Sequence, residues 1–345
     1  MSSTIPAYLR DRRGRDGVVI ALVNNMPDAA LKSTERQFRD LLSAVATHTP
    51  VTFKLFSFPE VVRSQAAREH IAQSYDQMDE LWTSRIDGLI ITGTEPHAAA
   101  LPDEPYWAAL INLIDWAEEH TSSTILSCLA AHAAVLHMDG ISREPLQQKL
   151  SGLFDCRKQI DHRIVGGVPN RWRLPHSRQN GLREAALVSN NYRIISQSDQ
   201  AGVDLFMKER KSLFIFSQGH PEYDRGTLYR EYRRDVGRYM AGERETYPEM
   251  PCNYFDTETA ASFAEFRRHA ESDRRSDLLA DFPAVEVETK LEHPWKTAAE
   301  GIYTNWLAYL TERKASPQKL SSSGRPAQRM APQQAGRAWK SVPKL

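Results

Sequence analysis

Short apolar segments alternate with amphipathic ones over the first half of the chain, and this alternation limits the fold more than any other feature. Four segments are apolar enough to be buried strands: Gly17–Val23, Val51–Phe56, Ile86–Ile91 and Ser123–Ser127. Helical periodicity follows the first strand as far as Val45 and fills Trp107–His120 between the last two. Strands separated by helices join through right-handed crossovers into a parallel sheet that is covered on both faces. We therefore expect an α/β fold with an open, doubly wound parallel sheet.

The second half of the chain has a different pattern of predicted strands and helices. Its strand candidates are shorter and predict a small antiparallel extension or hairpin: Tyr192–Ser196, Val203–Met207 and Leu213–Phe216. Helices are expected at Thr227–Met240 and at about Ala298–Leu310, with a charged surface insertion between them at about 256–290. Residues 315–345 are rich in Ser, Pro, Gln and Lys, which favours a disordered tail. We expect an N-terminal arm over 1–16, one domain over 17–314, and this tail.

The composition narrows the class of function. Among 345 residues, Lys and Arg equal Asp and Glu at 44 each, so no excess charge points to nucleic acid or a membrane surface. No apolar run is long enough for a secretion signal or a membrane span, and the cytoplasm is the expected compartment. The three cysteines are widely spaced, which fits neither a disulfide framework nor a zinc site. We therefore expect small-molecule substrates and no metal.

One of the cysteines, Cys128, stands where the fourth apolar strand runs directly into a helix of small residues. In a parallel sheet this is the carboxyl edge, where helix N-termini present free backbone N–H groups. The helix dipole there favours a thiolate, and the N–H of Leu129 could stabilise an oxyanion on an attacked acyl group. A buried structural cysteine gives the same local pattern. The local sequence leaves both interpretations open.

A candidate base follows a later strand, in the segment "FSQGHPEYD" at residues 216–224. His220 and Glu222 are two residues apart and lie on one side of an extended segment. In such a pair the imidazole takes a thiol proton, while the carboxylate accepts from the other ring nitrogen and fixes the tautomer. His-x-Glu occurs by chance in many chains. Together with a strand-end cysteine upstream, it favours nucleophilic catalysis.

Several segments carry a resemblance to a known family. In chain order they include "NNMPDAALKSTERQF", "STILSCLAAHAAVLHMDGI", "QKLSGLF", "LPHSR", "GHPEYDRGTLYREYRRDV" and "YTNWLAYL". They resemble the homoserine O-acyltransferase family of methionine biosynthesis, a branch of the class I glutamine amidotransferase-like superfamily with its flavodoxin-like sheet. The resemblance covers about residues 17 to 310. Glutaminases usually show Gly-x-Cys-x-Gly around the nucleophile, whereas this chain reads Ser127-Cys128-Leu129-Ala130.

The resemblance implies roles for particular residues. Cys128 would be the nucleophile that takes the acyl group from acyl-CoA, with His220 as base and Glu222 as its partner. The N–H groups of Leu129 and of the Gly93–Thr94 turn would form the oxyanion hole. Substrate contacts would come from Lys149, Ser177 and Arg234. The resemblance also implies a thioester, ping-pong kinetics, acyl-CoA as co-substrate without a further cofactor, and a homodimer.

The family position linked to the choice of acyl donor falls on His97. In the family a small residue there goes with succinyl-CoA and an acidic one with acetyl-CoA, and His97 is neither. Its imidazole could attract the free carboxylate of a succinyl group, or it could fill the space and leave room only for acetyl. We expect a homoserine O-succinyltransferase. Acetyl transfer, glutamine hydrolysis and a non-catalytic binding role on the same fold stay open as alternatives.

The remaining candidates receive simpler expectations. Lys32 comes too late after Met26-Pro27 to take a family role. Cys156 and Cys252 lack neighbouring acid–base pairs in the sequence and are expected to be inert. We expect His132 to be packed or to support the site from behind, and His176 to line the acceptor site.

Overall fold

The computed structural model describes residues 17–47 and 49–315. The expected N-terminal arm lies outside the described residues, and so does the expected tail apart from Ala315, which ends the last helix. No described helix combines the length and the apolar character needed to cross a bilayer.

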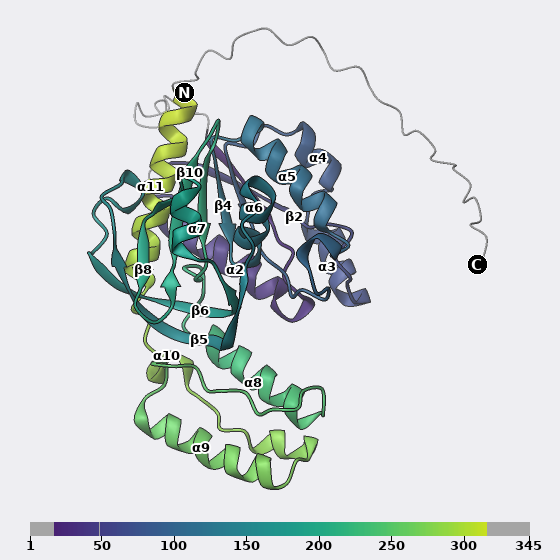
Figure 1. The fold of residues 1–345 in the computed structure, drawn as a ribbon. Helices are drawn as coiled ribbons and strands as arrows, with labels where there is room; N and C mark the ends of the chain where they lie inside the picture. Colours follow the sequence, from purple (N-terminus) through teal and green to yellow (C-terminus); the bar gives the residue numbers. More distant parts are fainter. Residues whose placement is uncertain (1–16, 48, 316–345) are drawn as a thin grey trace, which may run out of the picture.

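A seven-stranded sheet forms the centre of the molecule (Figure 1). Its strand order is β2-β1-β3-β4-β11-β10-β7. Its strands are β1 (Val18–Val23), β2 (Val51–Phe56), β3 (Gly88–Ile91), β4 (Ser123–Ser127), β7 (Arg193–Ile194), β10 (Leu205–Glu209) and β11 (Leu213–Ser217). The strands from β2 to β11 in this order are parallel, and β10 is antiparallel to both of its neighbours. The expected parallel sheet is confirmed.

Helices cover both faces of this sheet (Figure 1). One core contains buried residues of α2 (Asp28–Val45) and α11 (Lys296–Ala315), and the other contains those of α4 (Met78–Thr83), α5 (Trp107–His120), α6 (Leu129–Asp139) and α7 (Glu184–Ser189). A further helix, α3 (Gln65–Ser74), contributes Ala67 to the first core. Side chains of β1 alternate between the cores, because successive residues of a strand point to opposite faces. The sheet is therefore doubly wound, as expected.

A second sheet, four-stranded and antiparallel, is larger than the sequence pattern predicts. β5 (Glu144–Lys158) and β6 (Arg171–Gly181) form a long hairpin, which β8 (Ser196–Ser198) and β9 (Gly202–Val203) extend. The first half of β5 is polar and partly exposed, so its sequence lacks the alternation that marks a strand. The expected hairpin is present as β10 and β11, but β11 also pairs in parallel with β4 and so lies inside the main sheet.

The charged insertion at 256–290 packs against α8 (Thr227–Met240). It forms α9 (Thr257–Ser272), the 3-10 helix η4 (Ser276–Asp281) and the short α10 (Val287–Lys290). The rings of Phe263 and Phe282 contact each other and the rings of Tyr229 and Tyr232 on α8. Figure 1 shows α8 and α9 together below the β5–β6 hairpin. The insertion therefore buries one side of α8.

Replacing Phe263 with Ala should weaken this contact. Phe263 is 1% exposed, and truncating a buried phenylalanine lowers the free energy of unfolding by about 3 to 5 kcal/mol. Denaturant unfolding followed by circular dichroism measures the change. Val62→Ala, at a side chain that is 85% exposed, is the control and should cost less than about 0.5 kcal/mol. Equal losses in both variants would contradict a buried aromatic contact.

Candidate active site

Cys128 occupies a strained turn between β4 and α6. Its φ of 51° and ψ of −110° lie in a region that a residue with a side chain rarely adopts. Such strain costs on the order of 1 to 3 kcal/mol and persists only where the surroundings enforce it. The N–H of Cys128 donates to the carbonyl of Ser217 on β11 at 2.7 Å, and the small, buried alanines of α6 pack closely behind. This strand–turn–helix geometry is of the kind that can present a nucleophile at the edge of a sheet.

His220 and Glu222 lie in the loop that follows β11. Their side chains are buried, and Nδ1 of His220 is 2.8 Å from Oε1 of Glu222. Because the carboxylate can only accept, Nδ1 donates, which leaves Nε2 as the nitrogen for proton transfer. The ring of Tyr223 stacks on the His220 ring at 4.2 Å between centroids.

The structure brings Cys128, His220 and Glu222 together. Ser127 of β4 is opposite Ser217 of β11, so both strands end at the same level. Burial alone lowers the pKa of His220, but the Glu222 carboxylate and the hydrogen bond with Cys128 raise it well above its ordinary value. An imidazolium at this position is the partner that a thiolate requires.

The Gly93–Thr94 turn follows β3 and reaches the start of α6. A side chain is excluded at Gly93, because a Cβ there would lie 2.8 Å from Cβ of Leu129 and 3.0 Å from its backbone nitrogen. The N–H of Leu129 belongs to the first turn of α6, where backbone donors have no partner within the helix. The turn and this N–H therefore lie side by side.

Lys149 and Arg234 share one carboxylate. Nζ of Lys149 lies 2.7 Å from Oδ2 of Asp235, and Nη2 of Arg234 lies 2.9 Å from its Oδ1. Both cations thus have a defined partner, which joins β5 to α8. Ser177 lies in β6, half-buried and opposite Ser151. It is two residues from Pro175, whose carbonyl accepts from the N–H of His220.

The loop that carries His97 is fixed by acidic side chains. Oε1 of Glu104 accepts from the N–H groups of His97 and Ala98, each at 2.7 Å. Glu95 pairs with Arg238 of α8 at 2.8 Å. The His97 side chain itself is exposed. The structure therefore holds the backbone of this loop firmly and leaves the imidazole at its surface.

A cavity of about 530 Å³ is lined in part by Tyr223. Its lining includes Arg234 and also Lys32, to which the sequence assigns no role. The hydroxyl of Tyr223 donates to Oε1 of Glu231 at 2.8 Å, whereas Oε2 of Glu231 is buried without a hydrogen-bond partner among the described residues. Glu231 was missed from the sequence, although its position three residues before Arg234 on a predicted helix puts both on one face.

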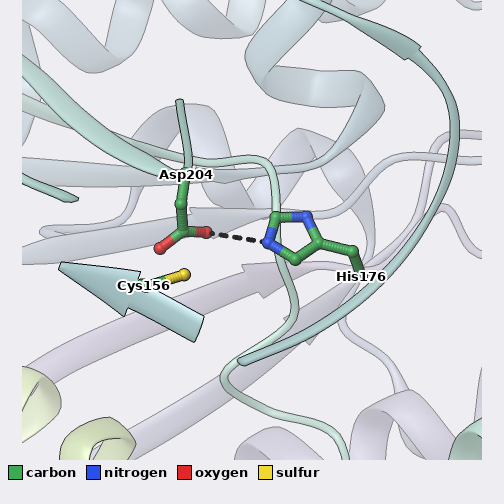
Figure 2. A group of neighbouring side chains, drawn as sticks. All are labelled: Cys156, His176 and Asp204. Carbon is green, nitrogen blue, oxygen red and sulfur yellow. Dashed lines mark ion pairs between the residues drawn. The ribbon is translucent and has the colours of Figure 1, made fainter. Parts of the chain in front are cut away.

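The buried Cys156 is a poor nucleophile. Burial, followed by the nearby Asp204 carboxylate, raises the pKa of its thiol far above the ordinary value. Figure 2 shows it beside His176 and Asp204 in the interior. His176 is fully buried, so the expectation that it lines the acceptor site is not supported by its environment.

His132 is packed as expected: burial lowers its pKa to about 4, and Nε2 lies 2.8 Å from Oε1 of Gln218.

Replacing Glu222 with Gln should lower the pKa of His220, because the carboxylate charge that raises it is removed. A histidine with a raised pKa in the folded state adds stability below its unfolded pKa, and this stability is lost as pH rises through the folded value. E222Q should therefore reduce the loss of stability toward alkaline pH. NMR titration of the His220 ring measures the pKa, with Glu312→Gln, at an exposed ion pair, as the control. An unchanged titration in E222Q would contradict the coupling.

The family model for homoserine O-succinyltransferase matches residues 10–316. The homoserine O-succinyltransferase of Methylorubrum extorquens is 45% identical over 296 residues, covering 86% of this chain and 88% of the relative. That of Bradyrhizobium japonicum is 45% identical over 305 residues, covering 88% and 93%. That of Nitrosococcus oceani is 32% identical over 334 residues, covering 92% and 93%.

Among solved structures, the chain is similar to a glutamine amidotransferase from Methylobacillus flagellatus, at 15% identity and a TM-score of 0.48, covering 92% of this chain and 100% of that one. A glutamine amidotransferase from Thermotoga maritima is 13% identical with a TM-score of 0.47, covering 86% and 100%. The family match over all of the described residues, together with 45% identity to relatives of similar length, shows that the chain belongs to the homoserine O-succinyltransferase family.

Proposed function

We propose that the protein transfers the succinyl group of succinyl-CoA to the hydroxyl of L-homoserine, a step in methionine biosynthesis. Family membership supports the activity, and one observation carries the mechanism: Cys128 lies in a strained elbow beside the buried pair of His220 and Glu222. In keeping with the resemblance, we further propose a homodimer that acts in the cytoplasm, with acyl-CoA as co-substrate and no other cofactor.

In the first half-reaction the Cys128 thiolate attacks the carbonyl carbon of succinyl-CoA. A bond forms between this carbon and Sγ, the bond to the CoA sulfur breaks, and the departing CoA thiolate takes a proton from the His220 imidazolium. Glu222 stabilises that imidazolium and fixes its orientation through the 2.8 Å hydrogen bond. The product is a succinyl thioester on Cys128 and neutral His220.

In the second half-reaction the homoserine hydroxyl gives its proton to Nε2 of His220 as its oxygen attacks the thioester carbonyl. The Cys128 thiolate leaves, and the imidazolium beside it is restored. Each half-reaction passes through a tetrahedral oxyanion. We assign its stabilisation to the N–H of Leu129 and to a backbone N–H of the Gly93–Thr94 turn, which the close contact between these segments supports.

The charges lining the cavity next to Tyr223 suit an amino-acid acceptor. Arg234 can bind the α-carboxylate of homoserine. Oε2 of Glu231, which has no hydrogen-bond partner in the described part of the chain, can accept from its ammonium group. Lys149 acts on this site through the carboxylate of Asp235 that it shares with Arg234. We place Ser177 among the acceptor contacts because its strand also supports the backbone of His220.

His97 is compatible with a succinyl donor. Its side chain is exposed, so it does not fill an interior space that the longer acyl group would need. An imidazole at the rim of the loop can also attract the free carboxylate of the succinyl group. We therefore keep succinyl-CoA as the proposed donor and acetyl-CoA as the alternative.

Intact-protein mass after mixing with succinyl-CoA, without homoserine, tests the thioester. We expect an adduct with the mass of one succinyl group, lost on addition of homoserine and absent from Cys128→Ala. Cys156→Ala is the matched control and should keep the adduct, because its thiol is buried. An acetyl adduct formed in preference from acetyl-CoA would change the donor. No adduct from either, with ammonia released from glutamine, would replace the proposal by an amidohydrolase.

Replacing Gly93 with Ala should block the proposed oxyanion site. The new methyl group would press on the N–H of Leu129, and the loss of one oxyanion donor typically lowers the rate about 100-fold. Rapid mixing with succinyl-CoA measures the acylation rate. Gly237→Ala on α8 is the control, since its Cβ would meet only the tip of Leu279 at 3.3 Å. A normal acylation rate in G93A would remove this turn from the mechanism.

A further inference from the structure

A buried group of three side chains lies behind the loop of residues 218–222, called the base loop because it carries His220, and has no part in the mechanism above. Cys156, His176 and Asp204 are at most 1% exposed, and their ligand atoms all lie within 4.8 Å of one another (Figure 2). Sulfur, imidazole and carboxylate are the ligand types of a transition-metal site. The group therefore needs an explanation.

The hydrogen bonds around His176 do not suit a metal ion. Nε of Arg178 donates to Nδ1 of His176 at 3.4 Å, so in the neutral imidazole the proton is on Nε2. It is Nε2 that faces Oδ1 of Asp204, at 3.5 Å. A histidine bound to a metal needs the opposite arrangement, with the ligating nitrogen free and the other one donating. The buried guanidinium of Arg178 also adds positive charge beside the group.

Asp204 instead binds the backbone that leads to His220. Its carbonyl accepts from the N–H of Gln218 at 2.9 Å, and Oδ1 accepts from the N–H of Gly219 at 3.3 Å. The next N–H, that of His220, donates to the carbonyl of Pro175 at 2.9 Å. Three consecutive backbone donors are thus held by two residues, and Asp204 takes two of them.

Gly219 rests directly on this group. A Cβ at Gly219 would lie 2.8 Å from Oδ1 of Asp204, 3.0 Å from Nε2 of His176 and 2.6 Å from Cδ2 of Leu174. The backbone just before the base therefore sits against the carboxylate, with no space between them. A change in the shape of the group would move His220.

Burying the carboxylate of Asp204 in the interior costs free energy. Burial raises the pKa of Asp204 to about 6, against the hydrogen bonds from Ser196 and Gly219 that lower it. Replacing buried charged groups by apolar ones of similar volume is often neutral or stabilising, so stability alone does not explain Asp204. The hydrogen bonds that Asp204 accepts from the base loop explain why a carboxylate is buried here.

We propose that Asp204 is a positioning residue for His220: its carboxylate fixes the backbone at Gly219, next to the Gln218 N–H that its main-chain carbonyl holds, so that the imidazole meets Cys128 at the correct distance. The inference rests on the proposed role of His220 as the base. Glu222 orients the ring from one side, and Asp204 holds the main chain from the other.

Steady-state kinetics of three variants tests this role. Asp204→Ala should lower kcat about 100-fold with the KM values unchanged, because a displacement of about 1 Å costs that much. Asp204→Asn should keep most of the activity, since its amide oxygen still accepts from Gly219. Asp87→Ala is the matched control: Asp87 is also buried and accepts the N–H of Val19 at 2.8 Å, but it precedes β3 at the opposite edge of the sheet. It should lose stability and keep kcat.

A second variant and a second readout keep the test independent of folding and of substrate. Gly219→Ala, which leaves Asp204 in place and pushes the loop away from it, should show the same fall in kcat. In both D204A and G219A, alkylation of Cys128 by iodoacetamide at neutral pH should slow, because His220 no longer supports the thiolate.

Normal kcat in D204A or G219A, or an equal loss in D87A, would overturn the inference. A loss in D204N as large as that in D204A would overturn it too, since the acceptor would then not be what matters. If the wild-type protein fails to turn over succinyl-CoA and homoserine, the proposed function fails. Alkylation then still decides the role of Asp204.

Discussion

The parallel pairing of β4 with β11 is the contact on which the candidate site depends. Ser127 stands opposite Ser217, and the N–H of Cys128 continues the ladder by donating to the carbonyl of Ser217. Both strands are buried at every position, so a shift by one residue would exchange their side chains between the two cores and disrupt the packing of both. The register that buries the core is therefore also the one that sets Cys128 beside the loop that carries His220.

The strain at Cys128 is maintained by packing rather than by local sequence. Neither Gly nor Pro assists the turn, and φ is positive all the same. The alanines of α6 allow the helix to approach the sheet, and Gly93 allows the neighbouring turn to touch Leu129. Each of these small residues allows a neighbouring segment to pack closely around the strained turn at Cys128. Cys128 itself stays partly exposed, and a strained backbone of this kind is typical of functional sites.

The sequence predicts local features well and tertiary partners poorly. α5 and α8 have the predicted bounds because their apolar residues follow a clear helical period, whereas the polar first half of β5 conceals a strand. The strand-to-helix pattern around Cys128 and the pair of His220 and Glu222 are each local in the sequence, so both can be predicted from it. Asp204 cannot be found this way. It stands between Val203 and Leu205, and only the hairpin of β10 with β11 brings it behind Gly219.

Two buried groups, His220 and Asp204, make the fold less stable as pH rises. His220 has a raised pKa, so its stabilising contribution is complete below its unfolded pKa and is lost as pH rises through the folded value. Asp204 also has a raised pKa, but for a carboxylate this means a cost that grows as pH rises from the unfolded pKa to about 6 and persists above it. Both effects have the same sign, although one group is a base and the other an acid. At neutral pH the chain thus accepts a charged carboxylate behind the loop and a protonated imidazole in front of it. Of these two groups, Asp204 lowers the stability at neutral pH, whereas the protonated His220 beside Glu222 adds to it.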